Sequence, residues 1–187
     1  NLRAEGVNGL MLGWTLGGYP SPNLEIAATV HAATVGAAAG EGLSADEVLL
    51  RVAARRFGPQ AAPGVMRAWQ QFSEAFSEFP FDIGVVYTAP QQYGPANLLY
   101  RKPTGYRATM VGFPYDDLER WAALYPPDVF LRQWRKVADG WAAGLATLAH
   151  ARAVAPSPAL EAEWRVAEAA GLHFRSVANQ VEFQDGD

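Results

Sequence analysis

The chain has 187 residues, no cysteine and a formal net charge of -4 at pH 7, and half of its residues are hydrophobic. This length and composition suffice for a globular domain with a sizeable core. The lack of cysteine excludes disulfides and thiolate catalysis. An acidic chain offers no overall basic field to nucleic acid or anionic lipid. No apolar run reaches the roughly 20 residues that cross a bilayer, so neither nucleic acid nor a membrane is an expected partner.

A short apolar segment near the N-terminus leads into a loop rich in glycine, proline and aromatic residues. Residues 10–16 (LMLGWTL) are almost continuously apolar, which is typical of a strand covered on both faces, as in a parallel α/β sheet. The loop residues 17–23 (GGYPSPN) follow directly. The rest of the chain offers few strands to pair with this one, and a buried strand without neighbours leaves its backbone groups unsatisfied. We therefore expect the chain to be the end of something larger.

Helical patterns occupy most of the remaining sequence. Ser21 as N-cap and Pro22 at the first helical position predict the start of the first helix. Ser44 and Glu47 form a capping box that starts the second. Apolar residues at helical spacing predict the others. The predicted helices cover about residues 21–39, 44–57, 63–79, 116–124, 128–148 and 160–178.

One long irregular excursion, residues 81–114, interrupts these helices and is rich in proline, glycine and tyrosine. Within it, residues 83–87 and 108–111 are the only candidates for short strands. A connection longer than about 12 to 15 residues is usually functional or disordered, and the aromatic content argues against disorder. The sequence thus predicts a mainly α fold with a single N-terminal strand. It divides into a strand–helix unit, residues 1–40, and a helical region, residues 41–187.

Two segments combine aromatic rings with amide, carboxylate or guanidinium groups: the loop after the predicted strand, and the excursion. Sugars suit this mixture, because their C–H faces pack on aromatic rings while their hydroxyls need convergent donors and acceptors. Trp14 is the best candidate for stacking on a ligand, with packing in the core as its alternative. The residues predicted to contact substrate are Trp14, Tyr19, Asn23, Asn97, Asp116 and Asp117.

Several of the polar residues also have ordinary structural explanations. One carboxylate of the pair Asp116-Asp117 is expected to cap the helix that follows, while the other is free to face a pocket. Glu25 is more typical of a first-turn partner of the helix dipole than of a catalytic acid or base. Nothing in the spacing of the carboxylates identifies a catalytic pair.

Other chemistries lack their motifs. The three histidines lie far apart in the sequence without metal-ligand spacing, so neither a metal nor a cofactor is expected. There is no serine-hydrolase elbow and no glycine-rich nucleotide motif. Arg101, Lys102 and Arg107 among tyrosines are compatible with single-stranded nucleic acid, but the acidic net charge argues against it.

Three segments resemble the C-terminal part of bacterial glycoside-hydrolase-like (β/α)8-barrel proteins: residues 9–23, residues 57–81 (FGPQAAPGVMRAWQQFSEAFSEFPF) and residues 94–118 (GPANLLYRKPTGYRATMVGFPYDDL). The resemblance implies that residues 10–16 are the last strand of a TIM-type barrel and that a helical extension beside the barrel mouth follows. Trp14 and Tyr19 would then lie at the C-terminal end of that strand, where barrel active sites are found. The other seven strands, and with them the catalytic acid and base, would lie outside this chain.

These observations predict the C-terminal portion of a carbohydrate-active barrel enzyme that contributes aromatic and polar sugar contacts and is inactive alone. Its expected partners are a carbohydrate ligand and the remainder of the barrel or a like chain. Two alternatives stay open. In the first, the chain is a helical interaction module whose excursion binds a protein. In the second, it is a structural cap that supports a barrel without touching substrate.

Overall fold

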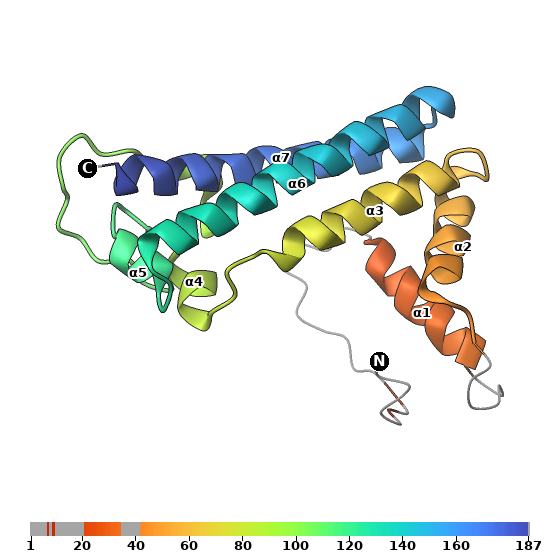
Figure 1. Cartoon of the computed structure of the whole chain (residues 1–187), viewed down its shortest axis with the longest axis horizontal. Helices are drawn as coiled ribbons and strands as arrows, with labels where there is room; N and C mark the ends of the chain where they lie inside the picture. Colours follow the sequence, from red (N-terminus) through yellow and green to blue (C-terminus); the bar gives the residue numbers. More distant parts are fainter. Residues whose placement is uncertain (1–6, 8, 10–20, 35–41, 187) are drawn as a thin grey trace. The chain divides into compact units, whose positions relative to one another are not determined.

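The structure is a computed structural model that describes residues 7, 9, 21–34 and 42–186 (Figure 1). The chain forms two compact units, residues 1–43 and residues 44–187, and each is considered by itself. Across these described ranges the secondary structure consists of seven α-helices and two short 3-10 helices, without any strand. The prediction of a mainly α fold is therefore confirmed for this part of the chain.

In the first unit the structure describes one helix, α1 (Pro22–Thr34). The Ser21 hydroxyl oxygen accepts the backbone N–H of Asn23 at 3.2 Å, and Glu25 lies in the first turn, so the predicted helix start is confirmed. The predicted strand over residues 10–16, with Trp14, lies outside the described residues. The same holds for Tyr19 and for the expected continuation of the helix to residue 39.

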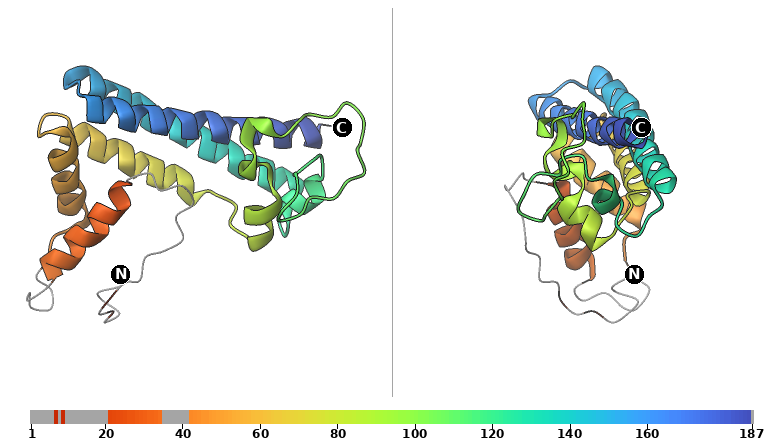
Figure 2. Two further views of the ribbon diagram at one scale, coloured as in Figure 1. Left: turned by 180° about the vertical axis from the view of Figure 1, so that it is seen from behind. Right: turned by 90° about the vertical axis from the view of Figure 1, so that its left-hand side faces the viewer.

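Four longer helices frame the second unit. They are α2 (Ala45–Phe57), α3 (Ala62–Ser77), α6 (Pro127–Val154) and α7 (Pro158–Asp185). Helix α6 packs along α3 on one side and along α7 on another, while α2 packs against α3 (Figures 1 and 2). The predicted capping box is present, because the Ser44 hydroxyl accepts the Glu47 N–H at 3.2 Å and the Glu47 carboxylate accepts the Ser44 N–H at 2.7 Å.

The close approach of α3 and α6 depends on small residues that face each other. A Cβ atom built at Gly64 would lie 2.8 Å from the Cβ of Ala151. One built at Gly140 would lie 2.8 Å from the Cβ of Ala75 and 3.2 Å from its backbone Cα. Separations below 3.0 Å are not tolerated between real Cβ atoms. Alanine at either glycine would thus push the two helices apart, in spite of its higher helix propensity.

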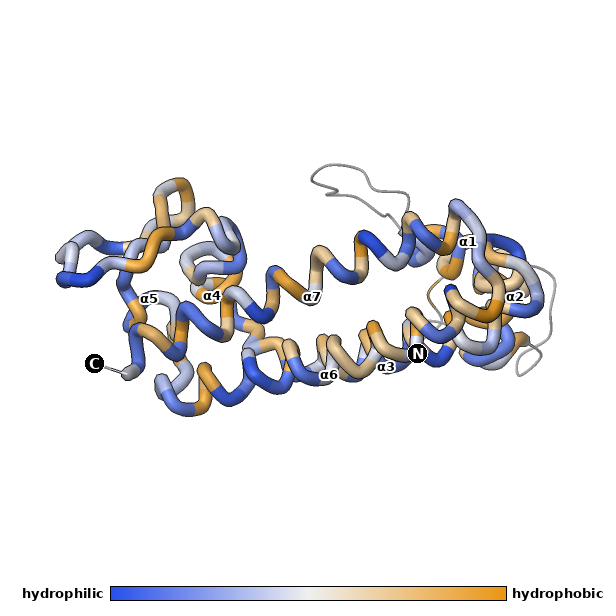
Figure 3. The backbone as a smooth tube through the Cα atoms, turned by 90° about the horizontal axis from the view of Figure 1, so that it is seen from above, coloured by the Kyte–Doolittle hydropathy of each residue, from blue (hydrophilic) through white to orange (hydrophobic). Residues whose placement is uncertain are grey.

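The excursion joins this frame through short helices and loops. The helices are α4 (Ile83–Thr88), η1 (Pro90–Gln92), η2 (Gly94–Ala96) and α5 (Leu118–Ala122). In Figure 3 the backbone around α4 and α5 carries both hydrophobic and strongly hydrophilic stretches. No helix in the described ranges is both long enough and apolar enough to span a membrane.

The prediction of short strands over residues 83–87 and 108–111 is wrong. The first segment is helix α4, because the Asp82 carboxylate caps it by accepting the Gly84 N–H at 2.7 Å. The second segment is irregular, and the N–H of Ala108 donates to the Asp117 carboxylate at 2.8 Å instead of to a neighbouring strand. Local side-chain acceptors thus replace the strand pairing that these short apolar runs would need.

A core of large aromatic residues lies where α4 and α5 meet α6 and α7. Trp121 and Trp134 are its two fully buried tryptophans. The ring of Trp134 packs edge-on against Phe79 and Phe130, at centroid distances of 5.2 and 6.2 Å. The indole N–H of Trp121 donates to the carbonyl of Pro114 at 2.8 Å, whereas that of Trp134 has no hydrogen-bond partner in the described structure.

This difference predicts unequal costs for two otherwise similar substitutions. Trp121→Phe should lower the free energy of unfolding by about 1–3 kcal/mol more than Trp134→Phe, since it leaves the Pro114 carbonyl without its donor. Trp134→Phe removes an unpaired buried N–H and loses packing only. Urea unfolding of both variants measures the difference, and equal losses would contradict the pairing seen here.

Candidate functional site

The candidate site lies on the loop over residues 97–117, which joins η2 to α5, and Asn97 ties the start of that loop to α7. The buried Asn97 side chain donates through Nδ2 to the carbonyl of Tyr115 at 3.0 Å and to Oε1 of Gln180 at 2.9 Å. Gln180 in turn donates to the carbonyl of Gly94 at 2.8 Å. The start of the loop is therefore held on the last long helix, and Asn97 links it to the other end of the loop at Tyr115.

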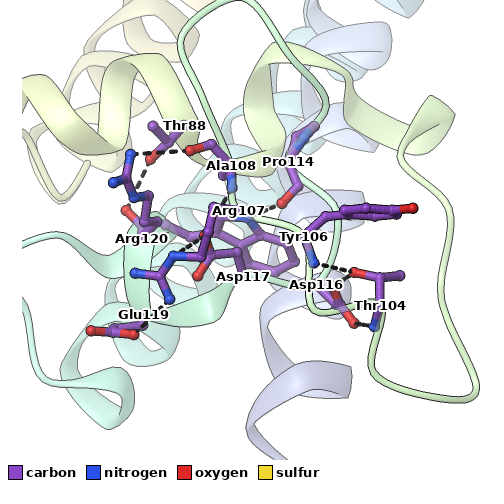
Figure 4. Close-up of polar contacts among 11 residues, drawn as sticks. Thr88, Thr104, Tyr106, Arg107, Ala108, Pro114, Asp116, Asp117, Glu119 and Arg120 are labelled. Carbon is purple, nitrogen blue, oxygen red and sulfur yellow. Dashed lines mark hydrogen bonds and ion pairs between the residues drawn. The ribbon is translucent and has the colours of Figure 1, made fainter.

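Asp117 fixes the returning half of the loop (Figure 4). Its carboxylate is buried, accepts the Ala108 N–H at 2.8 Å and lies 3.3 Å from Nε of Arg107. The same guanidinium donates to Glu119 at 2.9 Å. The Glu119 hydrogen bond, together with the negative charge of Asp117, raises the pKa of Arg107. Asp117 stands at the N-cap position of α5 but makes no side-chain cap hydrogen bond.

Asp116 anchors the tip of the loop. Its carboxylate accepts the backbone N–H of Thr104 at 2.7 Å and also the Thr104 hydroxyl. The hydroxyl oxygen of Thr104 accepts the N–H of Tyr106 at 3.2 Å, which closes a turn around Gly105 (Figure 4). The prediction that one of the two aspartates caps α5 through its side chain is wrong, because both carboxylates satisfy loop N–H groups instead.

The Asp116 anchor should be sensitive to acid. Partial burial raises the pKa of this carboxyl, but the hydrogen bonds from the hydroxyl and N–H of Thr104 outweigh it and hold the pKa below its usual value. Ionised Asp116 therefore stabilises the fold above the ordinary aspartate pKa of about 3.9, and this contribution is lost as the pH falls through the lowered folded pKa. Unfolding free energies of the wild type and Asp116→Asn, measured between pH 2 and 6, should converge at the acid end. A difference in unfolding free energy that stays constant from pH 2 to 6 would contradict a stabilising role for the ionised Asp116 carboxylate.

Four aromatic rings of this loop and that of Tyr93, which precedes η2, gather together, and we refer to them as the Tyr115 cluster: Tyr93, Tyr100, Tyr106, Phe113 and Tyr115. Tyr115 is central, with ring-centroid distances of 5.1 Å to Tyr106, 6.1 Å to Phe113 and 6.4 Å to Tyr100. Tyr93 joins through Phe113 at 4.8 Å. Tyr106 is 65% exposed and Phe113 is 50% exposed. Tyr106 and Phe113 are thus exposed, while Tyr93, Tyr100 and Tyr115 are partly buried.

The backbone at the centre of the cluster is strained. Tyr115 has a φ of 54°, which is uncommon for a bulky residue that is not glycine. Such a conformation costs about 1–3 kcal/mol and persists only where its surroundings enforce it. Asn97 holds the Tyr115 carbonyl, and the next residue is the anchored Asp116. Strain of this kind concentrates at binding and catalytic sites, so it singles out Tyr115 within the loop.

The residues predicted to contact substrate therefore do not all lie in one place. Asn97, Asp116 and Asp117 lie in one loop system, but their polar atoms bind the loop itself. Asn23 lies exposed on α1 in the other unit. Sequence reasoning does not single out Tyr106 and Phe113. The Thr104-Gly105-Tyr106 turn is a local signal for the placement of Tyr106, but no local signal indicates which rings stay exposed.

Within the described ranges, no group of three or more His, Cys, Asp or Glu side chains could hold a metal ion. Comparisons of the chain with protein-family models, with curated proteins and with solved structures find no match.

Proposed function

We propose that this chain is the C-terminal portion of a carbohydrate-active, glycoside-hydrolase-like barrel protein, and that the Tyr115 cluster is a sugar-binding surface in it. The observation that best supports this is the exposed ring of Tyr106 on a backbone that Thr104 and Asp116 hold in place. A fixed ring presents a flat apolar face to the C–H face of a sugar, and little conformational entropy is lost on binding.

The cluster also offers polar groups to a sugar. The phenol hydroxyls of Tyr100, Tyr106 and Tyr115 make no hydrogen bond to the described residues, so they are available to sugar hydroxyls. Asp116 and Asp117 have a different role, because their carboxylates position the loop. They accordingly have no catalytic part, and the acid and base of a hydrolase would lie outside the described residues.

Binding of neutral oligosaccharides tests this proposal. Hexasaccharides of glucose, N-acetylglucosamine and xylose are titrated into the chain, with chemical-shift changes and calorimetry as the readouts. Tyr106→Ala should weaken binding about tenfold, equivalent to about 1.4 kcal/mol. The matched control is Tyr87→Ala, because Tyr87 is an exposed tyrosine on α4 outside the cluster. Equal weakening by both variants would contradict the proposal, and so would no binding to any glycan.

A protein-docking role is the second candidate, since three large apolar side chains outside the cluster are well exposed. Phe81 is 72% exposed, Ile83 65% and Leu124 86%. Exposed apolar residues of this size are typical of interaction surfaces when they are contiguous. Leu124→Asp separates the two roles. If the exposed apolar residues dock a protein, Leu124→Asp should abolish association with that partner, while Tyr106→Ala should still bind it. If the Tyr115 cluster binds sugar, Leu124→Asp should leave the affinity for glycans unchanged.

A further inference from the structure

The charged groups around the Tyr115 cluster differ in whether they have a hydrogen-bond or ion-pair partner. All three carboxylates of the loop system have partners: Asp116 with Thr104, Asp117 with Ala108 and Arg107, and Glu119 with Arg107. Arg120 donates to the carbonyl of Ala108 at 3.3 Å. Each of these three carboxylates therefore already has a hydrogen-bond or ion-pair partner.

Two cations next to the cluster lack the partners that Arg107 and Arg120 have. Arg101 and Lys102 are exposed, and within the described structure neither makes an ion pair or a side-chain hydrogen bond. They follow Tyr100 directly, and consecutive Cα atoms are about 3.8 Å apart, so both backbone positions lie within about 8 Å of the Tyr100 Cα. The Tyr100 ring is 6.4 Å from that of Tyr115. The free charge beside the cluster is thus positive, on a chain whose net charge is -4.

We infer that the ligand of the Tyr115 cluster is an acidic carbohydrate, with carboxylate or sulfate groups on its rings, and that Arg101 and Lys102 bind these groups. This inference rests on the proposed function. Guanidinium and ammonium groups form charge-assisted hydrogen bonds to such anions, and these are stronger than hydrogen bonds between neutral groups. The aromatic rings supply stacking that every sugar shares, and the two cations supply selection by charge.

Matched pairs of oligosaccharides test the inference. An oligogalacturonate is compared with a galactan oligomer of equal length, and a sulfated galactan oligomer with its desulfated form. We expect at least one acidic member to bind about tenfold more tightly than its neutral counterpart at low salt, with an advantage that shrinks as NaCl is added. The pair in which the acidic member binds more tightly shows whether the ligand is a uronate or a sulfated sugar.

The variant Arg101→Ala with Lys102→Ala should remove this advantage and leave the affinity for the neutral member unchanged. Arg67→Ala is the matched control, since Arg67 is an exposed arginine on α3 that has no ion pair within the described structure. Tyr106→Ala should weaken acidic and neutral members alike. Equal affinities for acidic and neutral members would overturn the inference while the proposed function stands. An absence of binding to every member would overturn both.

Discussion

Replacing Asp117 by alanine is expected to lower the free energy of unfolding by about 2–3 kcal/mol, the larger effect of the two aspartates in the loop. The substitution leaves the N–H of Ala108, a fully buried residue, without its acceptor. Arg107 is half exposed and keeps Glu119, so it needs no new partner. The loss therefore comes mainly from one buried donor that folding has removed from water.

Urea unfolding of Asp117→Ala beside Asp116→Ala measures this effect. The two residues are neighbours, but the Thr104 groups that Asp116 binds are only partly buried, and water can replace its carboxylate there. The Asp116→Ala variant should accordingly lose less stability. A larger loss for Asp116→Ala would show that the tip of the loop, and not its returning half, carries the stability of this region.

Gly94→Ala is expected to destabilise the protein by about 2–4 kcal/mol, through two separate effects. Gly94 has a φ of 52°, a left-handed conformation that an alanine adopts only with strain. A Cβ atom there would also lie 2.5 Å from Nδ1 of His173 on α7. The ring of His173 would have to move away from the point where Gln180 binds the Gly94 carbonyl.

Two companion variants separate the effects of strain and collision. Gly105 has a φ of 71°, and a Cβ atom added there would have no neighbouring atom within 4 Å, so Gly105→Ala should show backbone strain alone, about 1–2 kcal/mol. Combining Gly94→Ala with His173→Ala removes the collision, so the double variant should lose less than the sum of the single losses. Simple additivity would show that His173 does not constrain this turn.

The features that sequence predicts correctly depend on local signals. The spacing of Val65, Trp69 and Phe72 indicates α3, and all three side chains are buried. The capping box of Ser44 and Glu47 involves groups only three residues apart. Such contacts need no knowledge of the rest of the fold. The residues drawn in grey in Figure 1, which include the predicted strand, remain outside this comparison.

The features that sequence does not predict depend on distant partners. The sequence identifies Asn97 as a candidate contact residue, but its acceptor Gln180 is 83 residues away, and no pattern near either residue indicates the pair. Asp116 and Asp117 precede a helix, which favours capping, yet Thr104 and Ala108 compete successfully for their carboxylates. Which tyrosines of the loop stay exposed follows from these attachments, so the surface of the Tyr115 cluster could not be derived from composition.

The attachment of the loop to α7 has a consequence for the order in which the protein is made. Gly94 is joined to Gln180, which lies 86 residues further along the chain. At a synthesis rate of about 5–20 residues per second, Gln180 is added about 4–17 s after Gly94. Throughout that interval the nascent loop lacks the Gln180 side chain that binds Gly94 and Asn97. The attachment of the loop to α7 is therefore among the last contacts of this unit to form, although the loop lies near the middle of the chain.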